Sequence, residues 1–318
     1  MNAVLQTHSL TKRYGSLAAV ADLSLEVNEG EVFGLLGPNG AGKTTSINMM
    51  CGLLRPDAGH VTIRGKPIVD GGADVRTRVG VCPQNIVLWG QLTCLEHMVF
   101  IGEMYGIGRR VARQRGEQLL KELDLTGKRN SRARTLSGGM QRRLNLAMAL
   151  VHDPEILVLD EPEAGLDPQS RVLVREYVKS LARRKTIILT THNMDEAERM
   201  ADRVAIIDRG KLLTLDTPEA LKRTVGEGDV LEIETSEDFA LSEVEGGVQI
   251  ALEAVAKIAP QVSSTNHTLV VRARGVVEFL PAILDALRSV NVHPAEVRLR
   301  ANTLEDVFIS LTGRRLRE

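Results

Sequence analysis

Residues 37–45 read Gly37-Pro38-Asn39-Gly40-Ala41-Gly42-Lys43-Thr44-Thr45 and match the pattern G-x-x-x-x-G-K-[ST] without a gap. The preceding residues, 31–36, form a short, mostly apolar run that predicts a buried strand, and residues 46–51 can continue as a helix. Strand, glycine loop and helix in this order predict a loop that binds a phosphate chain. A structural glycine turn that matches the pattern by chance is the alternative, and the flanking strand and helix argue against it.

The residue types in the loop suit phosphate binding. The glycines allow a tight turn and a close approach of the backbone to a phosphate. The loop N–H groups and the helix N-terminus offer partial positive charge to an anion. Lys43 should reach the β- and γ-phosphates, and Thr44 should place its hydroxyl on Mg²⁺. The loop alone does not distinguish among the many kinds of nucleotide-binding protein.

Length and composition exclude several classes. The 318 residues suffice for two domains, and 43% hydrophobic and 25% charged residues are ordinary for a globular protein. A formal net charge of −1 and 3% aromatic residues argue against a nucleic-acid-binding surface. Cys51, Cys82 and Cys94 have the spacing of neither a zinc site nor a redox pair, and we expect them to be buried. The sequence has no apolar run long enough for a membrane span and no signal-peptide pattern at its start.

Two adjacent acids follow a continuous aliphatic run. Residues 156–159, Ile-Leu-Val-Leu, predict a strand buried on both faces, and Asp160 and Glu161 follow at its carboxyl end. Adjacent strand positions point in opposite directions, so the two acids should have separate tasks. We expect Asp160 to hold the Mg²⁺ shell and Glu161 to face the γ-phosphate and polarise the attacking water. The alternative is a pair of acids that caps the next helix.

Gln84 and His192 are predicted at two further strand ends. Gln84 follows the predicted strand 79–83, and its amide can ligate Mg²⁺ or hold a water at the ligand-binding edge of an open α/β sheet. His192 follows the buried strand 186–191 and can donate a hydrogen bond to a γ-phosphate oxygen. A lone histidine is more often structural, but its place at a strand end of the same sheet favours function.

Two further stretches have open interpretations. Tyr14 lies on a predicted polar turn ahead of the glycine loop, where its ring could stack on an adenine or be a half-exposed turn residue. Ser137, Gly138 and Gly139 precede a predicted helix at 142–150 and make a second helix N-terminus with exposed backbone donors. A plain N-cap with a flexible approach is the alternative for that serine.

The pattern of helices and strands predicts two domains. The first, 1–225, is α/β with a helical insertion at about residues 85–135, and a glycine-rich linker follows at 226–229. The second, 228–318, is predicted as a small α+β domain with strands at 230–235, 268–273 and 292–299 and helices at 251–258, 277–290 and 304–311. The last helix carries one apolar stripe, either buried within the domain or paired with a second copy: Leu304, Val307, Phe308 and Leu311.

Over about the first 225 residues, these features together resemble the ATP-binding cassette (ABC) ATPases. Besides the acid pair and the residues at the other strand ends, the resemblance rests on the glycine loop and on the stretch 136–139, Leu-Ser-Gly-Gly, which is the specific part. It implies an α/β P-loop nucleotide-binding fold of ABC type that binds ATP and Mg²⁺ and hydrolyses ATP. It also implies that Tyr14 stacks on adenine, that Gln84 senses Mg²⁺, that Glu161 is catalytic and that His192 contacts the γ-phosphate.

The resemblance extends to partners. It implies a head-to-tail dimer in which each ATP lies between the glycine loop of one subunit and Ser137, Gly138 and Gly139 of the other, with Asp167 crossing the same interface. The C-terminal stretch 303–308, Thr-Leu-Glu-Asp-Val-Phe, resembles the end of ABC ATPases whose permeases are separate six-helix chains of the exporter type. The implied protein is cytoplasmic and peripheral on the inner membrane face, with an integral membrane permease and no nucleic acid as partner.

Two positions depart from the family pattern. Met140 stands where the signature usually has Gln, which weakens nothing essential. Glu163 stands where Ser or Thr is usual, and an extra acid beside the catalytic pocket could repel ATP and slow turnover unless its side chain points outward.

A soluble ABC-type ATPase of an assembly or nucleic-acid-related complex, without a permease, is the alternative function. The chain has neither a second glycine loop nor a long coiled coil between loop and signature, as such relatives in translation and DNA repair have. The apolar stretch Val87-Leu88-Trp89, just after Gln84, favours the transporter, and we expect it to line a groove for a cytoplasmic helix of the permease. Local packing inside the insertion is the alternative role for Trp89.

Overall fold

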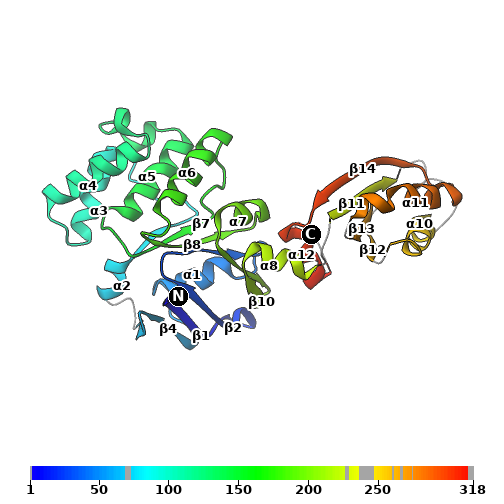
Figure 1. Ribbon diagram of the computed structural model, residues 1–318. Coiled ribbons are helices and arrows are strands. Elements are labelled where there is room, and N and C mark those ends of the chain that lie inside the picture. Colours follow the sequence, from blue (N-terminus) through cyan, green and yellow to red (C-terminus); the bar gives the residue numbers. More distant parts are fainter. Residues whose placement is uncertain are drawn as a thin grey trace. The chain divides into compact units, whose positions relative to one another are not determined.

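The computed structural model describes residues 2–68, 73–225, 229–235, 247–259, 261–265, 268–273 and 275–313. The chain divides into two compact units, Met1–Pro218 with Leu316–Glu318 and Glu219–Arg315 (Figure 1). Most of the predicted linker, residues 226–228, lies outside the described residues. Each unit has a sheet and a hydrophobic core of its own.

A six-stranded sheet forms the centre of the first unit. Its strands in spatial order are β10 (Lys211–Asp216), β9 (Arg203–Asp208), β3 (Val32–Leu36), β8 (Thr186–Thr191), β7 (Ile156–Asp160) and β6 (Val79–Cys82). All neighbours are parallel except β9 and β10, which form an antiparallel hairpin. Arg209 and Gly210 at its turn have φ of 48° and 77°, as a two-residue turn with two left-handed positions requires. The parallel strands bring their carboxyl ends, and the polar residues that follow them, to one edge.

A second, antiparallel sheet covers one side of this unit. Its order is β2 (Leu17–Asn28), β1 (Ala3–Tyr14), β4 (Ala58–Ile63) and β5 (Lys66–Pro67). Helix α1 (Lys43–Met50) contributes Ile47 and Met49 to a core shared with Phe33 and Leu35 of β3. The glycine loop therefore leads from a fully buried strand into a helix packed between two sheets.

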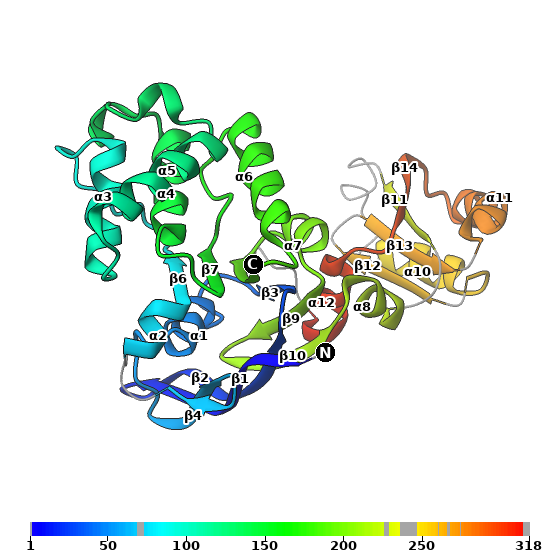
Figure 2. The ribbon, with the colours of Figure 1, turned by 60° about the vertical axis from the view of Figure 1, so that its left-hand side comes forward.

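Helices cover the other side of the central sheet (Figure 2). They are α5 (Gly138–Leu150), α6 (Pro168–Leu181) and α7 (Met194–Met200), while α3 (Cys94–Met104) and α4 (Arg109–Glu122) pack against α5, and α2 (Ala73–Arg78) precedes β6. Helices α3 and α4 pack side by side and make up the predicted helical insertion. Helix α3 begins with a capping box between Thr93 and Glu96.

The strand β7 contributes to both cores of the first unit. Leu157 and Leu159 pack into the core under the helices, and Ile156 and Val158 pack into the core between the two sheets. All four side chains are buried, as the uninterrupted aliphatic run predicted. The acids that follow this strand are therefore held at the end of a fully buried segment of the sheet.

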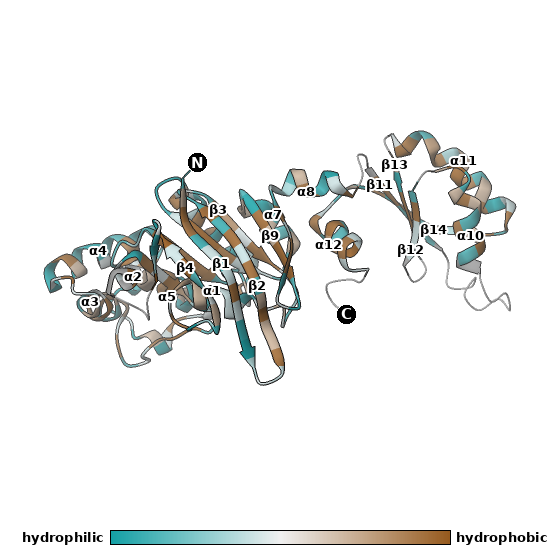
Figure 3. Ribbon diagram, turned by 90° about the horizontal axis from the view of Figure 1, so that it is seen from below, coloured by the Kyte–Doolittle hydropathy of each residue, from teal (hydrophilic) through white to brown (hydrophobic). Residues whose placement is uncertain are grey.

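The second unit is a four-stranded antiparallel sheet packed with two helices. The sheet order is β12 (Gln261–Thr265), β13 (Thr268–Ala273), β11 (Asp229–Thr235) and β14 (Pro294–Ala301). Its other elements are α8 (Pro218–Thr224), α10 (Gly247–Ala256), α11 (Val276–Ser289) and α12 (Leu304–Thr312). Residues of α10 and α11 share a core with the sheet. Hydrophobic and hydrophilic residues mix along α11, as expected for a helix with one buried side (Figure 3).

The last helix buries most of its apolar stripe within the chain. Leu304, Val307 and Phe308 are buried, and Leu311 is exposed. Thr303 and Asp306 form the capping box that begins the helix. No helix among the described residues is both long and apolar enough to cross a membrane.

Candidate functional site

At two positions of the glycine loop, only glycine fits. A Cβ atom at Gly37 would lie 2.3 Å from the Ile207 carbonyl oxygen, and one at Gly42 would lie 2.4 Å from that of Ala19. Gly42 also has a φ of 100°, which side chains rarely adopt. Helix α1 starts at Lys43, two residues before the end of the predicted loop, so the lysine itself lies in the first helical turn. The backbone N–H groups of this turn face the end of the loop.

Lys43 lies under the loop and is buried. Its Nζ donates to the carbonyl oxygens of Gly37 at 2.8 Å and Pro38 at 3.1 Å, and it lies 3.7 Å from Glu161 Oε1. Burial lowers the pKa of Lys43, and the carboxylates of Glu161 and Asp160 oppose that change. The ammonium group donates to neutral carbonyl oxygens of the loop, and an anion would be a stronger hydrogen-bond acceptor for it.

Asp160 connects two strand ends with the loop helix. Its Oδ2 accepts a hydrogen bond from Thr44 Oγ1 at 3.2 Å, and its Oδ1 accepts one from Thr190 Oγ1. Asp160 is buried, so its carboxylate has few hydrogen-bond donors other than these two hydroxyl groups. Thr44 and Asp160, each expected at the Mg²⁺ site, are therefore joined by a direct hydrogen bond.

Glu161 is where the predicted site residues converge. Its Oε1 lies 2.9 Å from His192 Nδ1, and its Oε2 lies 3.4 Å from Gln84 Nε2. Its φ of 49° ends the alternation of the strand, so Glu161 leaves β7 in a left-handed conformation. That conformation is held by the Glu161 N–H, which donates to Thr190 O and Oγ1, both at 3.1 Å. Together with Lys43, side chains from three distant parts of the sequence meet at this carboxylate.

Arg142 supports the same region and was missed by the sequence analysis. Its buried guanidinium donates to five carbonyl oxygens, those of Pro83, Gln84, Asp160, Glu161 and Pro162. It thereby holds together the backbone after β6, which carries Gln84, and the backbone after β7, which carries both acids. The charge is not paired with a carboxylate in these contacts, and carbonyl dipoles stabilise it instead.

The serine and glycines at the start of α5 form a second group with Asp167. Ser137 is the N-cap of α5 and accepts from the Met140 N–H at 3.3 Å. A Cβ atom at Gly139 would lie 3.3 Å from Asp167 Oδ2, so these two residues are neighbours. Asp167 caps α6 and accepts from the Ser170 N–H at 2.9 Å, which lowers the pKa of Asp167. The helix at Ser137 starts four residues earlier than predicted.

The structure places Tyr14 and Glu163 differently from what the sequence predicted. Tyr14 is the last residue of strand β1, not part of a turn, and 54% of it is exposed. Glu163 is buried, and Arg175 donates to both of its carboxylate oxygens at 2.7 Å. The acid therefore neither points outward nor leaves an uncompensated charge beside Glu161. The three cysteines are free and buried, as expected.

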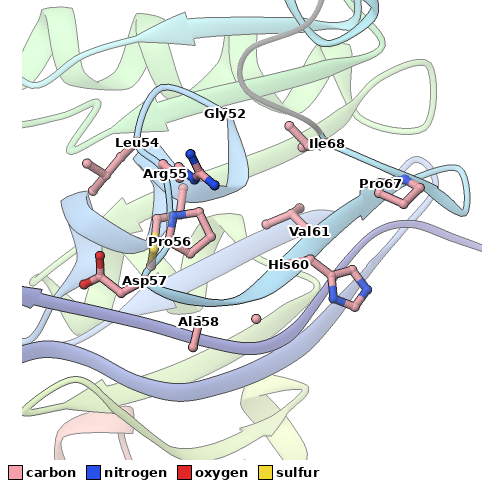
Figure 4. Close-up of a pocket in the computed structure, with 12 residues that line it drawn as sticks. Gly52, Leu54, Arg55, Pro56, Asp57, Ala58, His60, Val61, Pro67 and Ile68 are labelled. Carbon is pink, nitrogen blue, oxygen red and sulfur yellow. The ribbon is translucent and has the colours of Figure 1, made fainter.

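A separate pocket of about 380 Å³ lies beside the end of α1 (Figure 4). Its lining residues all fall between Met49 and Ile68, where Arg55, Asp57 and His60 are the charged or titratable ones. It is therefore distinct from the residues that gather at Glu161.

Known proteins resemble this chain in sequence and in fold. The profile of a family described as "ABC transporter" matches residues 20–164. The linearmycin resistance ATP-binding protein LnrL of Bacillus subtilis (strain 168) is 35% identical over 99% of this chain and 100% of its own length. The Nod factor export ATP-binding protein I of Ralstonia nicotianae is 40% identical over 99% of this chain and 95% of its own. A solved dimeric bacterial ABC transporter cassette is 26% identical with a TM-score of 0.62, covering 67% of this chain and 98% of that one.

The relatives match nearly the whole chain, the fold has a P-loop, and the site residues converge at Glu161. These observations lead to one conclusion. This chain belongs to the ATP-binding proteins of ABC transporters, the subunits that bind and hydrolyse ATP.

Proposed function

We propose that this chain is the ATPase subunit of an ABC exporter, that Glu161 is its catalytic base, and that a separate membrane permease is its partner. The observation that carries the catalytic assignment is the convergence of Lys43, Gln84 and His192 on the Glu161 carboxylate. Printed names of relatives support the exporter assignment, because they include linearmycin resistance and Nod factor export. The permease, which lines the transport path, would select the transported molecule.

Each converging side chain has a role in this proposal. The γ-phosphate would lie between Lys43 and His192, and Glu161 would accept a proton from the attacking water. His192 is already within 2.9 Å of Glu161, so it can orient the carboxylate as well as donate to the phosphate. The loop N–H groups and the α1 N-terminus would hold the remaining phosphate oxygens.

The residues that would hold Mg²⁺ fit that ion. Thr44 and Asp160 offer a hydroxyl and a carboxylate oxygen 3.2 Å apart, and the Gln84 side chain offers an amide oxygen close by. Magnesium prefers such hard oxygen ligands and keeps several waters or phosphate oxygens in its shell. When bound, the ion would neutralise the charge that develops on the phosphates.

A complete ATP site would need a second copy of the chain. Ser137, Gly138 and Gly139 form a group with Asp167, and none of the described hydrogen bonds joins this group to Lys43 or Glu161. We propose that these residues close over the ATP held by the glycine loop of the other copy, head to tail. Tyr14, exposed at the end of β1, would stack on the adenine.

The permease is proposed to dock on the helical insertion beside Trp89. Trp89 is 44% exposed and packs edge-on against Phe100 with ring centroids 5.1 Å apart. Phe100 in turn lines a groove of about 480 Å³ that also has Glu103 and Arg109 in its wall. Leu88, by contrast, packs against the core under the helices, so Val87 and Trp89 are the residues offered to a partner. Exposed aromatic residues beside a groove suit a protein interface.

The test of the catalytic assignment is Glu161→Gln. The substitution keeps the shape of the side chain and removes the base, so ATP hydrolysis should fall by roughly 10²–10⁴-fold while ATP binding is kept. Turnover and binding of a fluorescent ATP analogue should be measured on the same preparation. Glu117→Gln on the exposed face of α4 is the matched control. Wild-type turnover in the Glu161→Gln protein would refute the assignment.

A further inference from the structure

Strand β14 lies at an open edge of the C-terminal sheet. It pairs antiparallel with β11 along its length, with Leu299 opposite Leu231 and Val297 opposite Ile233, and it is the last strand in the sheet order. No further strand pairs with its other side among the residues that the structure describes. The N–H and C=O groups that point away from β11 are therefore available to another strand.

The apolar face of the sheet continues onto this strand, and no helix of the described part of the chain buries its apolar residues there. Leu231 and Ile233 are buried in the core under α10 and α11. Their cross-strand neighbours on the same face, Leu299 and Val297, are 51% and 38% exposed. An edge strand with uncovered apolar residues favours pairing with another chain.

The charges of β14 are arranged so that the strand complements itself. Glu296 and Arg298 lie on the opposite face from Val297, and Arg298 donates to both Glu296 oxygens at 2.7 and 2.6 Å. Charged side chains, lysine above all, often protect an edge strand against pairing, and like charges directly opposite each other repel. Here the signs alternate on the two sides of Val297.

We propose that β14 pairs antiparallel with β14 of a second copy, about a twofold axis at Val297. In this register Val297 faces Val297 of the second copy, and Ala295 faces its Leu299. Glu296 faces its Arg298, and the reverse pair forms as well. Cross-strand pairs of opposite charge and of apolar side chains are the units that stabilise a sheet.

The alternative registers are less favourable. Moving the axis by one residue places Arg298 opposite Arg298, or Glu296 opposite Glu296, and like charges directly opposite are destabilising. Moving the axis to a point between Val297 and Arg298 makes these two residues face each other across the strands. The apolar side chains of the two copies then lie on opposite faces of the sheet. Only the register centred on Val297 satisfies both the charge pattern and the apolar pattern.

The expected contact is small, because only residues 294–300 can pair about that axis. Interfaces below roughly 1,200 Å² are typically weak and transient. In a protein that also dimerises through ATP, such a contact would raise the effective concentration of one ATPase domain for the other. This consequence rests on the proposed ATP dimer, whereas the strand pairing does not.

The first test is sedimentation of the full chain without nucleotide across a dilution series. Arg298→Glu puts Glu opposite Glu in both cross-strand pairs and should raise the dimer dissociation constant by roughly tenfold. The double reversal Glu296→Arg with Arg298→Glu should restore it. Arg288→Glu, the same charge change at an exposed position of α11, is the control. Equal sedimentation of all four proteins would overturn the proposal.

The second test is disulfide cross-linking with diamide as the added oxidant, which takes up the two electrons and two protons from a thiol pair. Val297→Cys should cross-link two copies, because the residue faces itself across the axis, and Arg298→Glu should suppress the product. The native cysteines are buried, and burial raises the pKa of the Cys51 thiol to about 12, so they should stay unreactive. Val172→Cys, exposed on α6, is the control. Cross-linking no faster than this control would overturn the proposed register, and the absence of nucleotide keeps the outcome independent of the ATP site.

Discussion

Among single residues, Arg142 shows how one side chain can set the spacing of a site that it does not enter. Its guanidinium bonds the carbonyl of Gln84 on one strand end and those of Asp160 and Glu161 on the next. Gln84 and Glu161 face each other across this gap, with 3.4 Å between Nε2 and Oε2. A planar group with five donors can bridge several carbonyls at fixed angles, which a lysine cannot do. Arg142 therefore acts as a positioning residue for the carboxylate and the amide.

We expect Arg142→Lys to lower the free energy of unfolding by roughly 1–3 kcal/mol, because several buried carbonyl oxygens lose their donor. Urea unfolding followed by circular dichroism measures this loss. Hydrolysis should also fall, with a larger effect on kcat than on KM, since Glu161 is displaced after ATP has bound. Arg113→Lys on α4, where the arginine is exposed, should change neither quantity. Unchanged stability in Arg142→Lys would contradict the role assigned to these bonds.

The contrast between Glu161 and Arg142 shows what could be predicted at this scale. Glu161 was predictable because an acid that ends a fully aliphatic strand has an unusual environment that the local sequence displays. Arg142 was not, because an arginine in a polar stretch of helix normally faces solvent. Its partners lie 58–59 and 18–20 residues away, so only the folded chain brings them together. Glu163 was uncertain for the same reason, since its partner Arg175 belongs to another element.

Among the elements, helix α7 begins in an unusual way. Asn193 caps it, but Glu196, three residues on, does not reach back to the cap and instead accepts from Thr191 Oγ1 at 2.6 Å. Glu196 is only 5% exposed, and its Oε1 is buried without a hydrogen-bond partner among the described residues. Burial, helped by the charges of Glu163 and Glu161, raises the pKa of Glu196 to about 7. The acid is therefore protonated more readily than a surface glutamate.

This raised pKa predicts a pH-dependent stability. Between the ordinary glutamate pKa of about 4.5 and the raised value near 7, the folded chain binds more protons at Glu196 than the unfolded chain does, so stability falls as the pH rises. Glu196→Gln cannot lose a proton there. Its free energy of unfolding should match that of wild type near pH 5 and exceed it by roughly 1–3 kcal/mol at pH 8. Urea unfolding at several pH values measures the difference, and a gap that does not change with pH would argue against a buried neutral acid.

Strands and helices with a strong pattern were predictable, and weakly patterned ones were not. The alternating or continuous apolar residues of β7, β8, β11 and β13 identified these strands close to their observed bounds. Strand β12 (Gln261–Thr265) was missed, because Val262 is its single apolar residue and gives no alternation. Helix α1 begins earlier than its side chains suggest, since glycine and lysine at its start carry no helical periodicity.

For the molecule as a whole, the two units have different relations to the proposed partners. The first unit carries every predicted nucleotide-contacting residue and the exposed patch of Val87, Trp89 and Phe100. The second has its own core and the open edge of β14. Hydrolysis, permease contact and self-association should therefore be separable by substitution.

Trp89→Ala tests this separation at the permease side. The ring is partly exposed, so its loss should leave folding and the hydrolysis rate of the isolated chain close to wild type. Stimulation of hydrolysis by the reconstituted permease should be lost, because truncating a central aromatic residue commonly weakens a protein interface by 2 kcal/mol or more, roughly thirtyfold. Val172→Ala, exposed on α6, is the control. A Trp89→Ala protein that fails to fold would show that the ring serves local packing instead.

The shared strand β7 has a consequence for how the protein moves. Because its alternate residues belong to two cores, neither core can loosen around this strand without disturbing the other. Its amide protons can then meet solvent only when the first unit opens as a whole, which is the slowest class of fluctuation in a protein. Asp160 is its last residue and Glu161 follows directly. The two acids are thus carried by a segment that we expect to open slowly. The surfaces proposed to meet a partner lie on edges of the fold, which can rearrange far more quickly.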